Sequence, residues 1–385
     1  MGSNAGTVYV YNATTGTLVR QLNGQNTTGG ENFGFTIAVQ GNLMVVGAPN
    51  DTFGASRTGS AYFINPVTGT ELEYIGPSDD EAFQSFGNAV AMNSAVTLIG
   101  APLKDNADGS IGAVYAFLNS TMKELTVITP PLPRGNIRFG KGLAMTESHF
   151  IVGAYGSSSP TDTYPGEVYV YNVNTGLPTN LLVADIPDPA SQFGQNVDLE
   201  GNIAVVAAKT DNSFGEDAGA VYIFDIISGN QLARIGSPDP QPGAHFGSSI
   251  SINNGIIAVG ADKEDSAGES AGAVYTFDAD TYEFIAKSVP DELNAGTKFG
   301  SSVAIIDQRI VAGADILATV KTGAGHAYIL DPYCRPDLNQ DNTLDFFDLS
   351  TFLSDGTDWN EDGVFDFFDI SAFLNSFTRG CPELD

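Results

Sequence analysis

The stretch HFGSSISINNGIIAVGADKEDSAGESAGAVYTF, residues 245–277, decides the fold because its pattern recurs along the chain. It begins with a Phe-Gly pair, continues through an apolar run ending in Gly-Ala and an acidic loop, and closes on Gly-x-Val-Tyr. The phenylalanine recurs at a nearly constant interval, at Phe33, Phe86, Phe139, Phe193, Phe246 and Phe299. The tyrosine recurs with the same period, at Tyr9, Tyr62, Tyr115, Tyr169, Tyr222, Tyr275 and Tyr328. A fixed period, here about 53 residues, indicates a repeat architecture.

Within one repeat, the apolar residues follow the two-residue period of β-strands. Residues 249–252 alternate, residues 256–259 form a short apolar run, and residues 273–277 alternate again. A fourth strand is expected after a turn of the form Asn/Asp-x-x-Thr/Ser-Gly, found at 12–16, 65–69, 172–176 and 225–229. Four antiparallel strands per repeat predict the blade of a β-propeller, with a β-solenoid as the alternative. We expect the phenylalanine to pack between neighbouring blades and the glycine to let their backbones approach closely.

The excess of acidic over basic side chains limits the kinds of molecule that the protein is expected to bind. The formal net charge is −30, from 46 acidic and 16 basic side chains. Such a surface repels phosphate backbones and anionic lipids, so we expect no nucleic acid partner. No apolar run approaches the roughly 18 residues that a membrane span needs, so no membrane insertion is expected.

The two ends of the repeat region do not match. The chain has seven repeat tyrosines but six Phe-Gly pairs, and residues 2–11 align with residues 268–277, so the chain starts within a repeat. At the other end, the third strand at 327–330 leads directly through 331–333 to Cys334. Propellers commonly close by pairing strands from both termini in one blade, which removes exposed edges.

These observations predict a seven-bladed β-propeller over residues 1–333, truncated at its N-terminus, of which this chain carries six repeats and a half-blade. Residues 7–22 are expected to form two strands of a blade whose inner strands are missing, beside a last blade of three strands. The alternative is a six-bladed ring that residues 7–22 close as outer strands of the last blade.

Residues 2–330 resemble the FG-GAP repeats of integrin α-subunit propellers and many bacterial surface proteins. The resemblance rests on Phe-Gly, then Gly-Ala-Pro at 47–49 and 100–102, then Gly-x-Val-Tyr, recurring in register. It implies a secreted or cell-surface, non-catalytic protein for protein or glycan binding or adhesion. Integrin-type blades often carry a calcium loop D-x-D-x-D-G after Gly-Ala-Pro. None of the corresponding loops has that spacing; they hold Asp51, Asp105, Asp108, Asp162, Asp211, Glu216, Asp217, Asp262, Glu264 and Asp265.

Residues 334–385 have a different character, with one motif present in two copies, at 337–348 and 358–369. Positions 1, 3, 5, 7, 9 and 12 of the first copy are Asp337, Asn339, Asp341, Thr343, Asp345 and Asp348. Those of the second copy are Asp358, Asn360, Asp362, Val364, Asp366 and Asp369. Oxygen ligands at these positions, with a backbone carbonyl at position 7, are the calcium-loop arrangement. Carboxylates confined to so short a loop repel one another unless a cation neutralises them. The sequence therefore predicts two calcium ions; the alternative is an acidic disordered tail.

Each loop is followed by an expected short helix, at 345–354 and 366–377. These halves resemble the duplicated loop-helix of dockerins, and Gly380-Cys381 is similar to the end of GC-type dockerin-like domains. The resemblance implies a small α-helical tandem calcium-loop domain that tethers the propeller to a cohesin-like scaffold or envelope component. It assigns partner contact to Phe347 and Phe368, which otherwise form a second packing surface against the blades.

The two cysteines, Cys334 and Cys381, lie at the edges of this segment. A pair so placed indicates a disulfide that staples the small domain, which implies an oxidising compartment and an extracellular or cell-surface location.

No catalytic constellation is visible in the sequence. The three histidines fall in different repeats, and there is neither a Gly-rich phosphate loop nor a G-x-S-x-G motif. We therefore predict no catalytic residues. Paired carboxylates across the propeller face leave a carbohydrate-active enzyme attached to a scaffold as one alternative. A structural repeat protein of the cell envelope is the other.

Overall fold

The computed structural model describes residues 5–12, 15–26, 29–54, 56–79, 81–106, 109–156, 164–189, 191–290, 293–306, 309–315 and 325–330. These residues form strands and turns, with no helix among them, and none of their segments is a helix fit to cross a membrane. The chain divides into two compact units, Met1–Ile252 and Asn253–Asp385, which are described separately.

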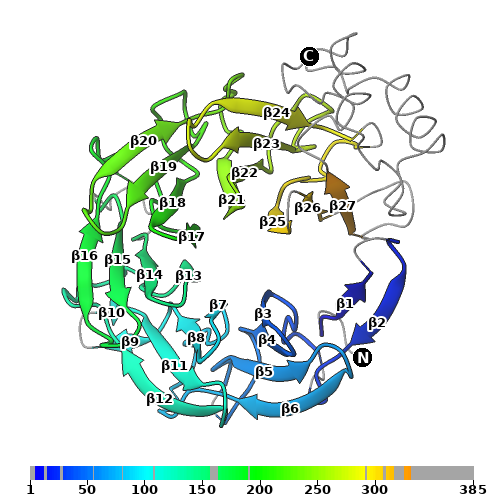
Figure 1. The fold of residues 1–385 in the computed structure, drawn as a ribbon, viewed down its shortest axis with the longest axis vertical. Helices are drawn as coiled ribbons and strands as arrows, with labels where there is room; N and C mark the ends of the chain where they lie inside the picture. Colours follow the sequence, from blue (N-terminus) through cyan, green and yellow to red (C-terminus); the bar gives the residue numbers. More distant parts are fainter. Residues whose placement is uncertain are drawn as a thin grey trace, which may run out of the picture. The chain divides into compact units, whose positions relative to one another are not determined.

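Four of the sheets in the first unit have four antiparallel strands each, in chain order (Figure 1). The first sheet comprises β3 (Thr36–Gln40), β4 (Leu43–Ala48), β5 (Ser60–Asn65) and β6 (Thr70–Ile75). The second comprises β7 (Ala89–Met92), β8 (Val96–Ala101), β11 (Ala113–Leu118) and β12 (Lys123–Ile128). The third comprises β13 (Leu143–Met145), β14 (His149–Ala154), β15 (Glu167–Asn172) and β16 (Pro178–Leu182). The fourth comprises β17 (Val197–Glu200), β18 (Ile203–Ala208), β19 (Ala220–Asp225) and β20 (Gln231–Ile235).

Within the first unit, β3, β7, β13 and β17 lie side by side as the inner strands, and β6, β12, β16 and β20 lie on the outer side (Figure 1). A short hairpin of β9 (Asp105–Asn106) and β10 (Gly109–Ser110) extends the loop between β8 and β11. β1 (Val8–Tyr11) and β2 (Leu18–Leu22) form a separate two-stranded sheet.

The strands of the second unit repeat the same pattern. One sheet has four strands in the order β21 (Phe246–Asn253), β22 (Ile256–Ala261), β23 (Ala273–Asp278) and β24 (Phe284–Ser288). Its first strand, β21, spans the boundary between the two units. The last sheet has three strands, β25 (Ser302–Ile306), β26 (Arg309–Ala314) and β27 (His326–Leu330).

The repeat phenylalanines pack between successive sheets, as predicted. Phe86 is fully buried, and its cluster joins Val45 and Phe63 of the first sheet to Ile99 and Tyr115 of the second. Burial of an aromatic side chain on this scale makes it a main source of cohesion between blades. Phe33, Phe139, Phe193 and Phe299 are buried in equivalent clusters.

Glycines let these sheets approach at two points. Gly59, at φ +89°, forms a bridge to Phe86, and a Cβ built on Gly59 would lie 2.2 Å from the Phe86 carbonyl oxygen. Gly87 of the Phe-Gly pair approaches Ser60, whose carbonyl oxygen would lie 2.3 Å from a Cβ on Gly87. Only glycine fits both the positive φ and the contact.

The prediction of seven blades is wrong: the described residues form an all-β propeller fold with six blades, one for each Phe-Gly pair. The seventh repeat tyrosine, Tyr9, lies in β1, whose two-stranded sheet has no Phe-Gly pair or inner hairpin of its own. Counting tyrosines therefore overstated the number of blades. The expectation that residues 7–22 form two strands and that the last sheet has three is confirmed.

Candidate binding site

Most of the residues assigned a role by the sequence lie outside the described residues. These are the predicted calcium ligands between Asp337 and Asp369, the partner-contact pair Phe347 and Phe368, and Cys334 and Cys381. Asp108 and Asp162 of the acidic loops are also outside. Their roles stay predictions, and the candidate site is built from the loops of the blades.

The acid of the first loop is enclosed by donors from its own blade. Asp51 is 4% exposed. Its Oδ2 accepts hydrogen bonds from the hydroxyls of Ser60 (2.5 Å), Tyr62 (3.1 Å) and Tyr74 (3.0 Å), and its Oδ1 accepts one from the Thr52 amide (2.7 Å). These donors occupy the oxygens that a cation would need.

An acid at the same interval before the repeat tyrosine recurs in two other loops. Asp211 accepts a hydrogen bond from the Tyr222 hydroxyl at 2.7 Å and is buried. In the second unit, Glu264 precedes Tyr275 by the same interval, is 1% exposed, and forms an ion pair of 3.1 Å with Lys287. Asp51 and Asp211 thus hold the tyrosines of their blades in place, and Glu264 holds a nearby cation.

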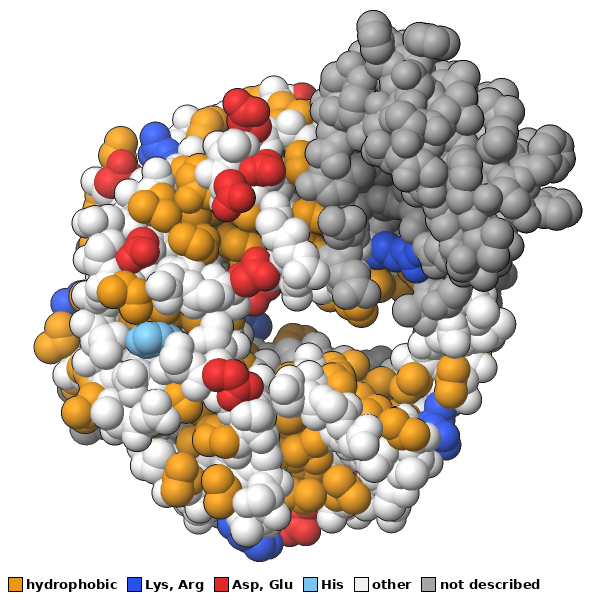
Figure 2. Space-filling model, viewed as in Figure 1, with side chains coloured by type: hydrophobic (Ala, Val, Ile, Leu, Met, Phe, Trp, Pro, Cys, Tyr) orange, Lys and Arg blue, Asp and Glu red, His pale blue; other side chains and the backbone are white. Residues whose placement is uncertain are grey.

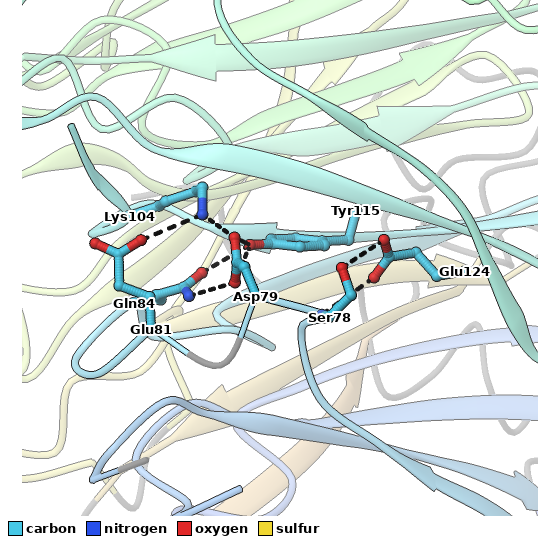
Figure 3. A network of polar contacts seen from close by, with 7 residues as sticks. All are labelled: Ser78, Asp79, Glu81, Gln84, Lys104, Tyr115 and Glu124. Carbon is cyan, nitrogen blue, oxygen red and sulfur yellow. Dashed lines mark hydrogen bonds and ion pairs between the residues drawn. The ribbon is translucent and has the colours of Figure 1, made fainter. Parts of the chain in front are cut away.

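In the second blade, the repeat tyrosine also donates a hydrogen bond to a carboxylate, but the carboxylate comes from a different position in the sequence. Lys104 occupies the equivalent position before Tyr115, and the carboxylate comes instead from Asp79 on the preceding loop (Figure 3). Asp79 accepts hydrogen bonds from Tyr115 (2.8 Å), Gln84 (2.7 Å) and Lys104. Burial alone would raise the pKa of Asp79, but the hydrogen bonds from these donors lower it below its usual value. The carboxylate therefore stays ionised.

The tyrosine hydroxyls in these contacts stay protonated. Burial, followed by the nearby carboxylate, raises the pKa of Tyr62 and of Tyr222 above the ordinary value. In the third blade, Glu167 accepts a hydrogen bond from Tyr169, whose pKa burial and Glu167 raise in the same way. Among the described residues, no group of three or more His, Cys, Asp and Glu side chains is arranged to hold a metal ion.

A different cluster of side chains lies where the loops meet the inner strands. The residues that directly follow the Phe-Gly pairs of the first three blades are Phe35, Asn88 and Lys141, just before β3, β7 and β13. The Lys141 Nζ atom donates to Asn88 Oδ1 at 2.8 Å and lies 5.5 Å from the centre of the Phe35 ring. Three neighbouring blades therefore contribute to one contact.

The charges around Lys141 are positive. Burial first, and then the charges of Lys209 and Arg138, lower the pKa of Lys141 from 10.5 to about 8. Arg138 itself lies over the Tyr155 ring at 5.2 Å and donates to its hydroxyl. We call Phe35, Asn88, Arg138, Lys141 and Lys209 the Lys141 cluster.

This concentration of cations contrasts with the chain as a whole, whose formal net charge is −30. On the face drawn in Figure 2, acidic side chains outnumber basic ones in view, and several of the acidic ones lie near one another. The Lys141 cluster was not predicted from the sequence. The available signal was the variable position after each Phe-Gly pair, occupied by Phe35, Asn88, Lys141, Gln195, Ser248 and Ser301. Variable residues at a fixed position of a rigid scaffold are typical of a binding surface.

Comparison with known families supports the repeat assignment. The model described as FG-GAP repeat matches residues 17–64, 70–117, 182–224 and 230–277. Each match starts at or near the outer strand of one sheet and ends in the third strand of the next, so it contains the Phe-Gly contact between two blades. No curated protein matches the chain.

Proposed function

Because the chain contains FG-GAP repeats folded as a six-bladed propeller, we propose that it is a non-catalytic binding or adhesion protein. The ligand, a protein or a glycan, binds the loops that hold the Phe-Gly pairs. The observation that carries the proposal is the state of the loop carboxylates. Asp51 and Asp211 are buried and accept hydrogen bonds from tyrosine hydroxyls.

Glycoside hydrolysis, the strongest rival activity, needs two carboxyl groups that reach the substrate, one of them exchanging a proton with it. Asp51 and Asp211 are buried and already accept hydrogen bonds from tyrosine hydroxyls, so they do not reach a substrate. These two carboxylates are therefore better suited to supporting their loops than to catalysis. This favours a binding protein over a carbohydrate-active enzyme.

We also propose a location and a tether, on the basis of the sequence. FG-GAP repeats are typical of extracellular or surface proteins. The ligand spacing in residues 337–369 supports a module that binds two calcium ions and attaches the propeller to a cohesin-like scaffold or envelope component.

The test is a comparison of retention and turnover. The full chain is immobilised and exposed to panels of polysaccharides and extracellular proteins, in calcium and in EDTA. We expect at least one ligand to be retained and released unchanged, in EDTA as well as in calcium. Steady release of new reducing ends from a polysaccharide, abolished by Asp79→Asn, would instead identify an enzyme.

A further inference from the structure

We propose that the Lys141 cluster binds a uronic acid of an acidic polysaccharide, the carboxylate of the sugar pairing with Lys141 and its ring lying against Phe35. This inference rests on the proposed binding function and names the ligand class and the place. It depends on four features of the described residues: an ammonium without an anion, a fixed position, an exposed aromatic ring, and a buried acceptor.

The first feature is the charge of Lys141. Its described contacts are a neutral amide, Asn88, and an aromatic ring, Phe35. The charges that act on it, Lys209 and Arg138, are of the same sign. A half-buried ammonium in such surroundings has lost water and gained no anion, which is unfavourable. A carboxylate brought by a ligand would supply the missing charge, and Arg138 and Lys209 would add to the attraction.

The second feature is that the backbone holds Lys141 in place. Arg138 and Gly140 both have positive φ, at +53° and +92°. The Lys141 amide donates to the Arg138 carbonyl at 3.3 Å, which closes the turn before β13. A cation on a fixed turn, supported by contacts from two other blades, is already positioned for its ligand, and this reduces the entropy lost on binding.

The third feature is the apolar surface beside the cation. The Phe35 side chain is 50% exposed, and Ile37 and Val39 of the adjoining strand β3 are 45% and 54% exposed. Side chains of this size left open to water on an inner strand form a small apolar surface. The C–H face of a sugar ring can cover it, because that face is apolar while the ring edge carries the hydroxyls.

The fourth feature is a hydrogen-bond acceptor on the neighbouring blade. Gln195 follows the next Phe-Gly pair, and its backbone carbonyl would lie 3.2 Å from a Cβ on Gly142, next to Lys141. The Gln195 Oε1 atom is buried and has no hydrogen-bond donor among the described residues. Such an acceptor needs a donor. A sugar hydroxyl can supply that donor; an acidic peptide can supply one only through its backbone N–H groups, because its carboxylates only accept.

The net charge of −30 opposes any polyanion at long range. At about 0.15 M salt the Debye length is about 8 Å, so most of that repulsion is screened while the close contact with Lys141 is retained. Binding should therefore be measured at this ionic strength. EDTA is included so that calcium does not bridge the ligand to residues 334–385.

The experiment titrates the full chain with a galacturonic acid tetramer, its methyl-ester form, and tetraglutamate. The matched variants are Lys141→Gln and Lys123→Gln, since Lys123 is an exposed lysine on outer strand β12 that pairs with Glu73. We expect the acid tetramer to bind wild type and Lys123→Gln equally, and to bind Lys141→Gln at least about tenfold more weakly. The methyl ester and tetraglutamate should bind wild type at least about tenfold more weakly than the acid tetramer.

The pH dependence gives an independent readout. The charged form of Lys141 binds the carboxylate, and its pKa is about 8. The affinity of wild type should therefore fall about tenfold between pH 7 and pH 9, and that of Lys141→Gln should stay constant. Thermal unfolding of both variants at pH 7 checks that the fold is retained.

Each contrary result has a distinct meaning. Equal binding of the acid tetramer to wild type and Lys141→Gln overturns the assignment to Lys141. The assignment also fails if none of the three probes binds wild type. Tight binding of tetraglutamate that depends on Lys141 overturns the sugar and identifies an acidic peptide instead. The proposed binding function survives these results if the ligand panels yield another retained ligand, and it fails if they yield none.

Discussion

Tyr62 donates its hydroxyl hydrogen to Asp51 across 3.1 Å inside the first blade. Ser60 and Tyr74 donate to the same carboxylate oxygen. This acid follows the Gly-Ala-Pro of its repeat, where integrin-type blades often begin a calcium loop. Here protein donors surround the carboxylate, and it supports the blade from within.

Removal of the acid should cost more stability than removal of one of its donors. Tyr62→Phe deletes one hydrogen bond and leaves Asp51 with three others, so we expect a loss of about 1 kcal/mol in the free energy of unfolding. Asp51→Ala leaves several buried hydroxyls without an acceptor and should cost about 3 kcal/mol. Urea unfolding measures both, with the exposed turn variant Thr68→Ala as control. The reverse order would show that Asp51 is not the centre of this network.

The approach of two blades at Gly59 should be intolerant of any side chain. In Gly59→Ala, the new Cβ would meet the Phe86 carbonyl oxygen at 2.2 Å, at a φ of +89°. We expect a loss of about 3 kcal/mol or more, from strain and displacement of the next blade. Gly41→Ala is the matched control, because its φ is +58° and nothing lies within 4 Å of its Cβ. It should cost about 1 kcal/mol, and equal losses in the two variants would contradict the close approach.

Lys141 should make the free energy of unfolding change with pH in the alkaline range. Its pKa is about 8 in the folded protein against an ordinary value of 10.5, so between these values the unfolded chain binds a proton that the folded chain does not. The contribution of Lys141 to the free energy of unfolding therefore rises with pH between about pH 8 and pH 10.5. Relative to Lys141→Met, wild type should gain free energy of unfolding between pH 8 and pH 10. A constant difference between the two proteins would mean that Lys141 is not desolvated.

Much of the fold could be predicted from the periodicity of the sequence, whereas much of the candidate site could not. The strand pattern, the four-stranded sheets and the burial of Phe86 between blades were predictable, because apolar period and turn residues are local properties of the chain. The number of blades was not, because Tyr9 carries the repeat signature without the inner strands that complete a blade.

Some side-chain contacts could likewise be predicted from the sequence, and others could not. The recurrence of an acid at one fixed interval before Tyr62 and Tyr222 was visible in the sequence, but its replacement by Lys104 in the second blade conceals the rule. The Lys141 cluster was missed because Phe35, Asn88 and Lys141 each lie one full repeat apart in the sequence. They meet only when three inner strands are placed side by side.

The predicted tether can be separated from calcium binding. Replacing Phe347 and Phe368 with serine should leave two calcium ions bound per full chain and abolish pull-down of an envelope or scaffold protein carrying a cohesin-like domain. These residues fall on expected helices whose neighbouring positions are small and polar by sequence, so the change should not disturb the loops. Loss of thermal stability in the double variant would show that both phenylalanines pack in a core.

The stoichiometry of calcium binding tests the central claim, that Asp51 and Asp211 accept hydrogen bonds from the protein's own donors and do not hold a calcium ion in the blades. Calorimetric titration of the full chain should give two calcium ions per chain, with tighter binding in the loop that contains Gly363 than in the loop that contains Asn342. In the Asp337→Ala, Asp358→Ala double variant, which removes position 1 of both C-terminal loops, high-affinity calcium binding should disappear. A calcium ion that stays bound in that variant and is lost on further replacement of Asp51 or Asp211 would contradict the claim.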